Sequence, residues 1–382
     1  MNETVRLGII GLGNIGQQHI AHVRSGEAGS CVVSALASRG ASTLAEEISA
    51  RHYSDYRQLI DSGNCDAVIV ATPTMSHKEI GSYALQKGLH VLMEKPLGLS
   101  VAEGEALLAE ARPGQVFALM LNQRVAPVFS KAKEVISAGV LGTLQRTQWT
   151  MTNWFRPEVY YQVSDWRATW RGEGGGLLLN QCIHNIDIYQ WLCGVPTSVR
   201  GFCGFGKYHD IEVEDEATAY FEYENGATGV FTGSTGEAPG VNRLDIVGDK
   251  AMLSFDGVQL LLRENTPGTA QYSRETRDMF GQPDNCKTDI TPHKIVNQHA
   301  LLIANFVDAI LTGVDLIAPA AQGINSLAIA NAILWSAWSG ERIALPLDSG
   351  AYQLALEDKL ADSRLRQKSD IKPVIDMEAS YR

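Results

Sequence analysis

The stretch from Gly174 to Asp187 places polar side chains within an apolar sequence. Asn180, His184 and Asp187 are spaced at i, i+4 and i+7, so a helix over this stretch presents all three on one face. Polar groups in such a helix cost free energy unless they are paired or used. The pattern therefore predicts a catalytic helix, with His184 suited to proton transfer near neutral pH. The alternative is a core histidine whose hydrogen bonds are satisfied.

A second motif, G-x-G-x-x-G at residues 11–16, lies between an apolar run at 5–10 and a helical pattern reaching about residue 23. Between a strand and a helix this spacing is typical of a dinucleotide-binding turn. The first glycine permits the tight turn, the second admits a pyrophosphate, and the third lets helix and strand pack closely. The helix N-terminus offers free N–H groups to the phosphates. We therefore expect the dinucleotide to contact Gly11, Gly13, Asn14, Ile15 and Gly16; an ordinary glycine-rich turn is the alternative.

Apolar runs at 31–37, 66–70, 90–93 and 116–121 alternate with helical patterns at 41–50, 55–60, 76–87 and 101–111. This alternation predicts an α/β domain with a parallel sheet covered on both faces. Ligands bind beyond the carboxyl ends of such strands. The residues in those places, which we expect to bind the cofactor, are Ser38, Arg39, Thr72, Pro73, His77, Glu94, Lys95 and Asn122.

Two of these positions carry more specific chemistry. An NAD site usually has an acidic residue after the second strand, but here Ser38 and Arg39 follow it. They suit a 2′-phosphate, which favours NADP(H) over NAD(H). Alternatively, Arg39 stacks on adenine or faces water, and both cofactors are accepted. Lys95, in the sequence Glu94-Lys95-Pro96, follows a strand, where its ammonium can stabilise a substrate oxygen; a solvated loop lysine is the alternative.

Beyond residue 122 the pattern changes to helices at 128–138, 299–311 and 324–338 and to strands at 143–151, 217–223, 227–232, 244–247, 251–255 and 258–263. Asn225-Gly226 predicts a hairpin turn. Residues 264–294 are rich in turn-forming residues and are expected to form a long loop. We therefore predict two domains: a dinucleotide-binding domain at 1–122, and a substrate-binding and oligomerisation α/β domain at 123–382.

Five of the seven tryptophans lie between residues 149 and 191, and arginines are interleaved with the aromatic residues there. Tryptophan and tyrosine combine an apolar face with a polar group, which suits a sugar ring. They can equally form core or an oligomer interface. Arg156, Arg167 and Arg171 either bind an acidic substituent or pair with Glu158, Asp165 or Glu173 as surface charges. The predicted substrate-binding residues are Lys95, Arg124, Trp154, Tyr160, Trp166, Arg167, Asn180 and His184.

Composition limits the class of protein. The net charge of −11 and the lack of a basic stripe argue against nucleic acid as a partner. No apolar run approaches the roughly 20 residues of a membrane span, and no secretory signal is evident. The six cysteines show no paired spacing, which indicates reduced thiols in a cytoplasmic protein. Cys182 and His184 point in different directions on a helix, so no metal site is expected.

With its glycine motif, Glu94-Lys95-Pro96 and residues 174–187, the chain resembles the Gfo/Idh/MocA oxidoreductases over most of its length. The resemblance implies an N-terminal Rossmann domain and a C-terminal α/β domain with an open, mainly antiparallel sheet. It implies NAD(P)-dependent oxidation or reduction of a carbohydrate: a sugar, an inositol or a related polyol. It also implies that Lys95 is the catalytic lysine and His184 the acid/base histidine. Because an open sheet needs cover, a homodimer or homotetramer is expected.

One position departs from the family pattern. Many members have aspartate four residues before the histidine, whereas this chain has Asn180, as some sugar-oxidising members do. Asparagine can bind a hydroxyl but cannot accept a proton, so more of the chemistry falls to His184 and Lys95, with Asp187 as a candidate to orient the histidine or bind substrate. Two other functions stay open: redox-neutral glycoside hydrolysis through a transient keto-sugar, and a non-catalytic sensor of dinucleotide and sugar.

Overall fold

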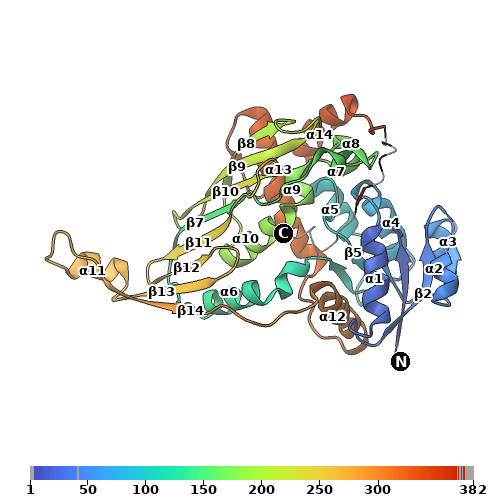
Figure 1. Ribbon diagram of the computed structural model, residues 1–382, viewed down its shortest axis with the longest axis horizontal. Helices are drawn as coiled ribbons and strands as arrows, with labels where there is room; N and C mark the ends of the chain where they lie inside the picture. Colours follow the sequence, from blue (N-terminus) through green and yellow to red (C-terminus); the bar gives the residue numbers. More distant parts are fainter. Residues whose placement is uncertain (1–3, 41–42, 368, 370, 372, 375–382) are drawn as a thin grey trace. The chain divides into compact units, whose positions relative to one another are not determined.

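The computed structural model describes residues 4–40, 43–367, 369, 371 and 373–374, which form two compact units (Figure 1). Unit 1 extends to Ala126 and includes Gly172–Gly174 and Val296–Leu327. Unit 2 comprises Pro127–Arg171, Gly175–Ile295 and the chain from Ala328 onward. The chain therefore returns to unit 1 twice, which a division at residue 122 into two uninterrupted domains does not anticipate. The second return supplies helix α12 (Gln298–Thr312), whose apolar side completes the core of unit 1.

The sheet of unit 1 has six parallel strands in the order β3-β2-β1-β4-β5-β6. This is the order of a dinucleotide-binding Rossmann domain, and it confirms the predicted parallel sheet. The strand β3 was not predicted, since its three residues follow a helical pattern. The bounds are β1 (Val5–Ile10), β2 (Cys31–Ala37), β3 (Arg51–Tyr53), β4 (Ala67–Val70), β5 (His90–Met93) and β6 (Phe117–Leu119).

Helices connect these strands and begin with side-chain caps at several points. Asp55 accepts from the N–H of Arg57, Ser100 from Glu103 and Asn297 from Ala300, which satisfies N–H groups of the first turn. The helix predicted at 41–50 is shorter, and residues 41–42 lie outside the described part. The remaining helices of unit 1 are α1 (Asn14–Arg24), α2 (Thr43–Glu47), α3 (Tyr56–Asp61), α4 (His77–Gln86) and α5 (Val101–Leu108), with 3-10 turns η1 (Thr74–Ser76), η2 (Asn122–Val125) and η3 (Ala320–Gln322).

The sheet of unit 2 has nine strands in the order β14-β13-β12-β11-β7-β10-β9-β8-β15. Only β10 and β7 pair in parallel among the strands described, so the sheet is mainly antiparallel, as expected. The bounds are β7 (Leu144–Met151), β8 (Ser198–Phe205), β9 (Glu214–Glu222), β10 (Thr228–Ser234), β11 (Asn242–Gly248), β12 (Ala251–Phe255), β13 (Leu260–Thr266), β14 (Asp284–Asp289) and β15 (Ile343–Ala344).

The long loop predicted at 264–294 is wrong. Strand β13 continues to Thr266, helix α11 (Thr269–Glu275) follows, and β14 pairs back along β13. Figure 1 shows α11 at the end of this extended hairpin. Every residue of β14 is exposed, so its sequence has no apolar alternation from which a strand could be predicted.

Helices cover one face of the nine-stranded sheet. Tyr189 of α10 lies so close over β10 that a Cβ on Gly229 would stand 2.1 Å from its hydroxyl oxygen. On the opposite face, Phe202 and Tyr220 keep 61% and 42% of their surface exposed. The helices are α6 (Pro127–Ser137), α7 (Glu158–Gln162), α8 (Trp170–Glu173), α9 (Leu177–Asn180), α10 (Ile183–Cys193), α13 (Gly323–Ser339) and α14 (Ser349–Asp362). None of the helices described is long and apolar enough to cross a membrane.

Candidate functional site

The glycine loop of unit 1 has the shape that a dinucleotide requires. Gly11 has a φ of +98°, and a Cβ there would lie 2.6 Å from the carbonyl oxygen of Ala71. A Cβ on Gly16 would lie 2.0 Å from the carbonyl oxygen of Gly11, so only glycine lets α1 approach β1. A Cβ on Gly13 would meet nothing within 4 Å, and no side chain caps this helix end. Open space in front of uncapped N–H groups fits the pyrophosphate of a dinucleotide.

At the end of β2, Ser38 contacts a histidine that was not among the predicted site residues. The Ser38 hydroxyl donates to the Gly40 carbonyl over 3.0 Å and lies 2.9 Å from Nε2 of His52 on β3. Arg39 is exposed. Serine, arginine and histidine offer hydrogen-bond donors rather than the carboxylate typical of a ribose 2′-hydroxyl site. His52 was missed because β3 itself was not predicted.

Lys95 is set apart from its neighbours by exposure. Between residues 91 and 100 it is the one residue that is not buried. Glu94 is 7% exposed, lies 2.8 Å from Nε2 of His19 and accepts from the Lys95 backbone N–H at 3.3 Å. Burial opposes ionisation of Glu94, but the hydrogen bond from His19 and nearby positive charge outweigh it and lower the pKa of Glu94 to about 2. Glu94 is thus a buried carboxylate that supports the backbone at Lys95, and its contact with a cofactor stays a prediction.

His77 ties together the loops that follow β4 and β5. Its ring nitrogens lie 2.9 Å from the carbonyl oxygen of Thr72 and 2.8 Å from that of Pro96. The ring is 1% exposed, and burial lowers the pKa of His77. This geometry favours a positioning role, next to the cis Lys95–Pro96 peptide, over the predicted direct contact with the cofactor.

Asn122 and Arg124 are also buried. The Asn122 amide donates to Oε1 of Gln298 over 3.0 Å. Arg124 is 1% exposed, and its guanidinium donates to the carbonyl oxygen of Ile317 over 3.2 Å and to Gln322. The Arg124 side chain thus ties η2 to the segment around η3, and its contact with substrate stays a prediction.

In unit 2 the predicted catalytic helix is interrupted. Helix α9 ends at Asn180 and α10 begins at Ile183. The carbonyl of Leu177 accepts from the N–H of Gln181 over 3.1 Å and from that of Cys182 over 2.8 Å, so one turn is widened by a residue. Such wide turns are frequent at functional sites. Asn180 is half-buried, whereas His184 and Asp187 are 8% and 1% exposed, and Asp187 accepts from Gln190 over 3.1 Å.

A buried glutamate that was not among the predicted site residues binds the start of the segment from Gly176 to His184. Glu214 on β9 is 1% exposed, and its carboxylate accepts from the backbone N–H of Gly176 over 2.8 Å and from that of Leu178 over 2.8 Å. Such bonds satisfy N–H groups that a helix start leaves unpaired. Glu214 therefore fixes where the segment carrying Asn180 and His184 begins.

Tyr160 orders the polar end of α9. Its hydroxyl donates to Oδ1 of Asn180 over 3.3 Å, and accepts from Nε2 of Gln181 over 3.2 Å and from the Arg167 guanidinium. Trp154, in contrast, is 8% exposed and donates from its indole N–H to Asn185 over 3.1 Å. The structure thus brings Tyr160, Arg167 and Asn180 together, and it places Trp154 in the core; Trp166 is half-buried beside Arg167.

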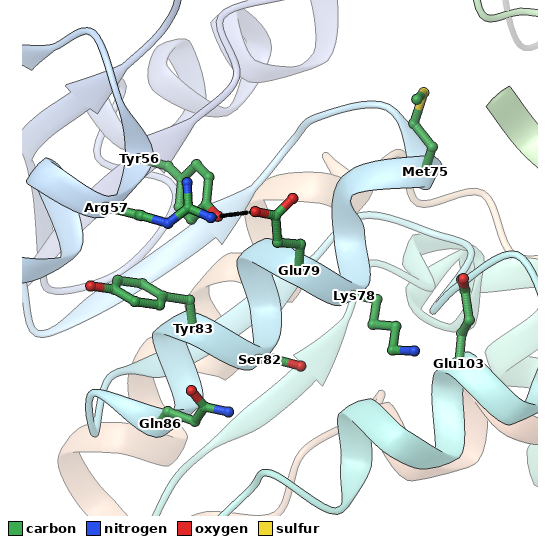
Figure 2. Close-up of a pocket in the computed structure, with 9 residues that line it drawn as sticks. All are labelled: Tyr56, Arg57, Met75, Lys78, Glu79, Ser82, Tyr83, Gln86 and Glu103. Carbon is green, nitrogen blue, oxygen red and sulfur yellow. Dashed lines mark hydrogen bonds and ion pairs between the residues drawn. The ribbon is translucent and has the colours of Figure 1, made fainter. Parts of the chain in front are cut away.

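A separate pocket of about 340 Å³ lies in unit 1 along α3 and α4 (Figure 2). Two of its charged side chains are paired with each other: Arg57 forms an ion pair with Glu79, and the Tyr56 hydroxyl donates to the same carboxylate over 2.7 Å. It contains none of the predicted site residues. Across the part of the chain that is described, no group of three or more His, Cys, Asp or Glu residues could hold a metal ion.

Comparison with known proteins gives two family matches. A profile described as "Oxidoreductase family, NAD-binding Rossmann fold" matches residues 5–122, and one described as "GFO/IDH/MocA C-terminal domain" matches residues 129–254. The scyllo-inositol 2-dehydrogenase (NAD(+)) of Bacillus subtilis is 30% identical over 60% of this chain and 67% of its own length. The myo-inositol 2-dehydrogenase of Thermotoga maritima is 27% identical over 67% of this chain and 76% of its own.

Solved structures share the fold. The WlbA dehydrogenase of Bordetella pertussis, in complex with NADH and UDP-GlcNAcA, superposes with a TM-score of 0.76 at 24% identity and covers 90% of this chain and 100% of its own. A levoglucosan dehydrogenase in complex with NADH and levoglucosan gives a TM-score of 0.75 at 20% identity. The match covers 90% of this chain and 100% of the levoglucosan dehydrogenase.

Proposed function

The chain belongs to the Gfo/Idh/MocA family of NAD-binding oxidoreductases, and we propose that it transfers a hydride between a nicotinamide cofactor and a hydroxyl or carbonyl carbon of a sugar, inositol or sugar derivative. The observation that carries the proposal is Lys95. It is the one residue in a buried ten-residue stretch that keeps its side chain partly exposed, and it follows β5 in a unit whose glycine loop fits a dinucleotide.

Each residue has a distinct task in this proposal. A nicotinamide cofactor, when bound, would supply the hydride acceptor or donor. His184 takes the hydroxyl proton as the carbonyl forms, because an imidazole titrates near neutral pH. Lys95 donates a hydrogen bond to a substrate oxygen and stabilises the negative charge that develops on it. Asn180 binds a substrate hydroxyl without accepting a proton, and Asp187 helps to hold the helix that carries His184.

A panel of sugars and polyols, offered with NAD and NADP separately, tests the proposal. A dehydrogenase reduces the cofactor in proportion to the keto-sugar formed. A redox-neutral hydrolase releases an aglycone with no net cofactor reduction. A sensor binds cofactor tightly and turns over nothing, and that result would remove the proposed activity.

For the cofactor, we propose NADP(H) over NAD(H), because Ser38, Arg39 and His52 offer donors and no carboxylate at the end of β2. Contacts of these groups with a 2′-phosphate are charge-assisted, so we expect the Kd for NADPH to be about 10-fold or more below that for NADH. Arg39→Asp should reverse the order. Fluorescence titration of both cofactors measures it. Equal affinities for NADPH and NADH, unchanged by Arg39→Asp, would mean that Arg39 does not bind the 2′-phosphate.

The exposed face of the nine-stranded sheet supports the proposal of a homo-oligomer. Phe202 and Tyr220 lie on neighbouring strands and are 61% and 42% exposed. We expect Phe202→Asp to shift the protein towards monomers in light scattering at micromolar concentration, because a charge would be buried in the interface. Val258→Asp, in the β12–β13 turn, is the control. An unchanged mass for Phe202→Asp, or a monomeric wild type, would contradict this.

All six cysteines are free, which is consistent with the proposed cytoplasmic location.

A further inference from the structure

Arg167, Tyr160 and Trp166 form a half-buried cluster in unit 2, and we infer that this cluster is a binding site for an anionic substituent of the substrate, such as the carboxylate of a sugar acid. The inference rests on the proposed function, since it narrows its substrate class. It assigns to Arg167 the recognition of charge, while the transfer of hydride and proton stays with the groups named above.

The three arginines of this region have different environments. Arg171 is exposed and donates to the carbonyl oxygen of Leu360 over 3.2 Å, so it secures the end of α14. Arg156 is 9% exposed, with its backbone N–H bonded to Thr235 and its carbonyl accepting from His209. Arg167 is half-buried, and its guanidinium carbon lies 4.4 Å from the ring centre of Tyr160 and 4.7 Å from that of Trp166.

Arg167 has no negative partner in the described chain. Within that part it forms no ion pair, and its one side-chain hydrogen bond is the donation to the Tyr160 hydroxyl. Asp165, two residues earlier and the acid closest in sequence, is exposed and leaves Arg167 unpaired. The lack of an acidic partner for Arg167 is not due to composition, because the chain has 43 acidic and 32 basic residues. A guanidinium has five N–H donors, so Arg167 keeps donors for a ligand.

The aromatic rings fix how these donors are presented. Stacking on Tyr160 and Trp166 stabilises the cation and restrains its plane, but it supplies no counter-charge. The guanidinium of Arg156 lies 5.2 Å from the same Tyr160 ring, which adds positive charge on that side. A restrained guanidinium fork matches a carboxylate or a phosphate, each of which can accept two parallel hydrogen bonds.

The cluster is linked directly to a predicted catalytic residue. Tyr160 accepts from Arg167 and donates to Oδ1 of Asn180 over 3.3 Å. The anion site and Asn180 are therefore separated by two hydrogen bonds, of about 3 Å each. A charged substituent on a sugar that Asn180 binds can span this distance to Arg167.

Matched pairs of substrates test the inference: glucose with glucuronate and glucose 6-phosphate, and galactose with galacturonate. We expect kcat/KM to be higher for the acid of at least one pair and to fall as salt is added. The ratio of kcat/KM for acid to that for neutral sugar should fall about 10- to 100-fold in Arg167→Gln, the loss expected for a hydrogen bond to a charged group. Arg167→Lys should retain part of the ratio, and Arg171→Gln should not change it.

Calorimetric titration of glucuronate and glucose 6-phosphate into the cofactor-loaded protein gives a second readout without turnover. Binding that weakens in Arg167→Gln but not in Arg171→Gln supports the inference. The ligand with the lower Kd shows whether the site prefers a carboxylate or a phosphate. An Arg167→Gln effect that is equal for acid and neutral sugars would overturn it while leaving the dehydrogenase intact. Anion binding without reduction of any cofactor would instead retain the subsite and reject the proposed function.

Discussion

Replacing Lys95 with methionine is expected to lower kcat by about 10²- to 10³-fold, the usual loss when one donor to a developing oxyanion is removed. Methionine keeps an unbranched side chain of similar reach but has no charge and no N–H. The loss should fall on kcat rather than on cofactor affinity, because the glycine loop rather than the ammonium holds the dinucleotide phosphates. Steady-state kinetics on the best substrate of the panel, together with NADPH and NADH titrations, would separate the two quantities.

Lys78→Met is the matched control. Lys78 is exposed on α4 of the same unit and lines the separate pocket shown in Figure 2. We expect it to leave kcat within a factor of about two, in line with the small effect of ordinary surface substitutions. An unchanged kcat in Lys95→Met would show that Lys95 is a loop lysine without a catalytic role.

Replacing Glu214 with glutamine is expected to lower the free energy of unfolding by about 2–3 kcal/mol. Oε1 of the carboxylate accepts from the N–H groups of both Gly176 and Leu178, and Oε2 accepts from Gly176, so an amide with its oxygen in the place of Oε1 turns its NH₂ towards the N–H of Gly176. Two buried donors would then face each other at the start of α9. Because α9 leads to Asn180 and then to His184, we expect kcat to fall as well, with cofactor affinity unchanged.

Urea unfolding measures the first effect as a lower midpoint with an unchanged slope, and steady-state kinetics measures the second. Glu216→Gln is the control on the same strand. Glu216 pairs at the surface with Lys207 over 2.6 Å, so its loss should cost less than about 1 kcal/mol. If Glu214→Gln were no more destabilising than Glu216→Gln, Glu214 would not position the helix.

Local pattern was sufficient for the parallel sheet, the glycine loop and the strand end at Lys95. Each depends on residue types at fixed short spacings: Gly11, Gly13 and Gly16 at one turn, and apolar runs of four to seven residues in the strands. Asn225-Gly226 likewise predicted the hairpin between β9 and β10, whereas the open, mainly antiparallel form of the second sheet was implied by the family resemblance.

The features that were missed depend on contacts distant in sequence. Glu214 lies 38 residues from Gly176, and no spacing rule relates a strand carboxylate to a helix start. Arg124 follows a predicted strand, but its buried side chain donates to Ile317 and Gln322, which are almost 200 residues away in sequence. The wide turn at Gln181 and Cys182 breaks a helix whose side-chain spacing is regular, because backbone hydrogen bonding rather than composition decides it.

The transfer of a labelled hydride tests the central claim most directly. The protein is mixed with oxidised NADP or NAD and the best sugar of the panel, deuterated at its CH–OH carbons, and the cofactor is analysed by mass spectrometry. The proposed function predicts one deuterium in each reduced cofactor and one keto-sugar for each, with the rate of both lowered about 10²- to 10³-fold in Lys95→Met. A cofactor that stays oxidised and unlabelled with every sugar, despite tight binding, would contradict it.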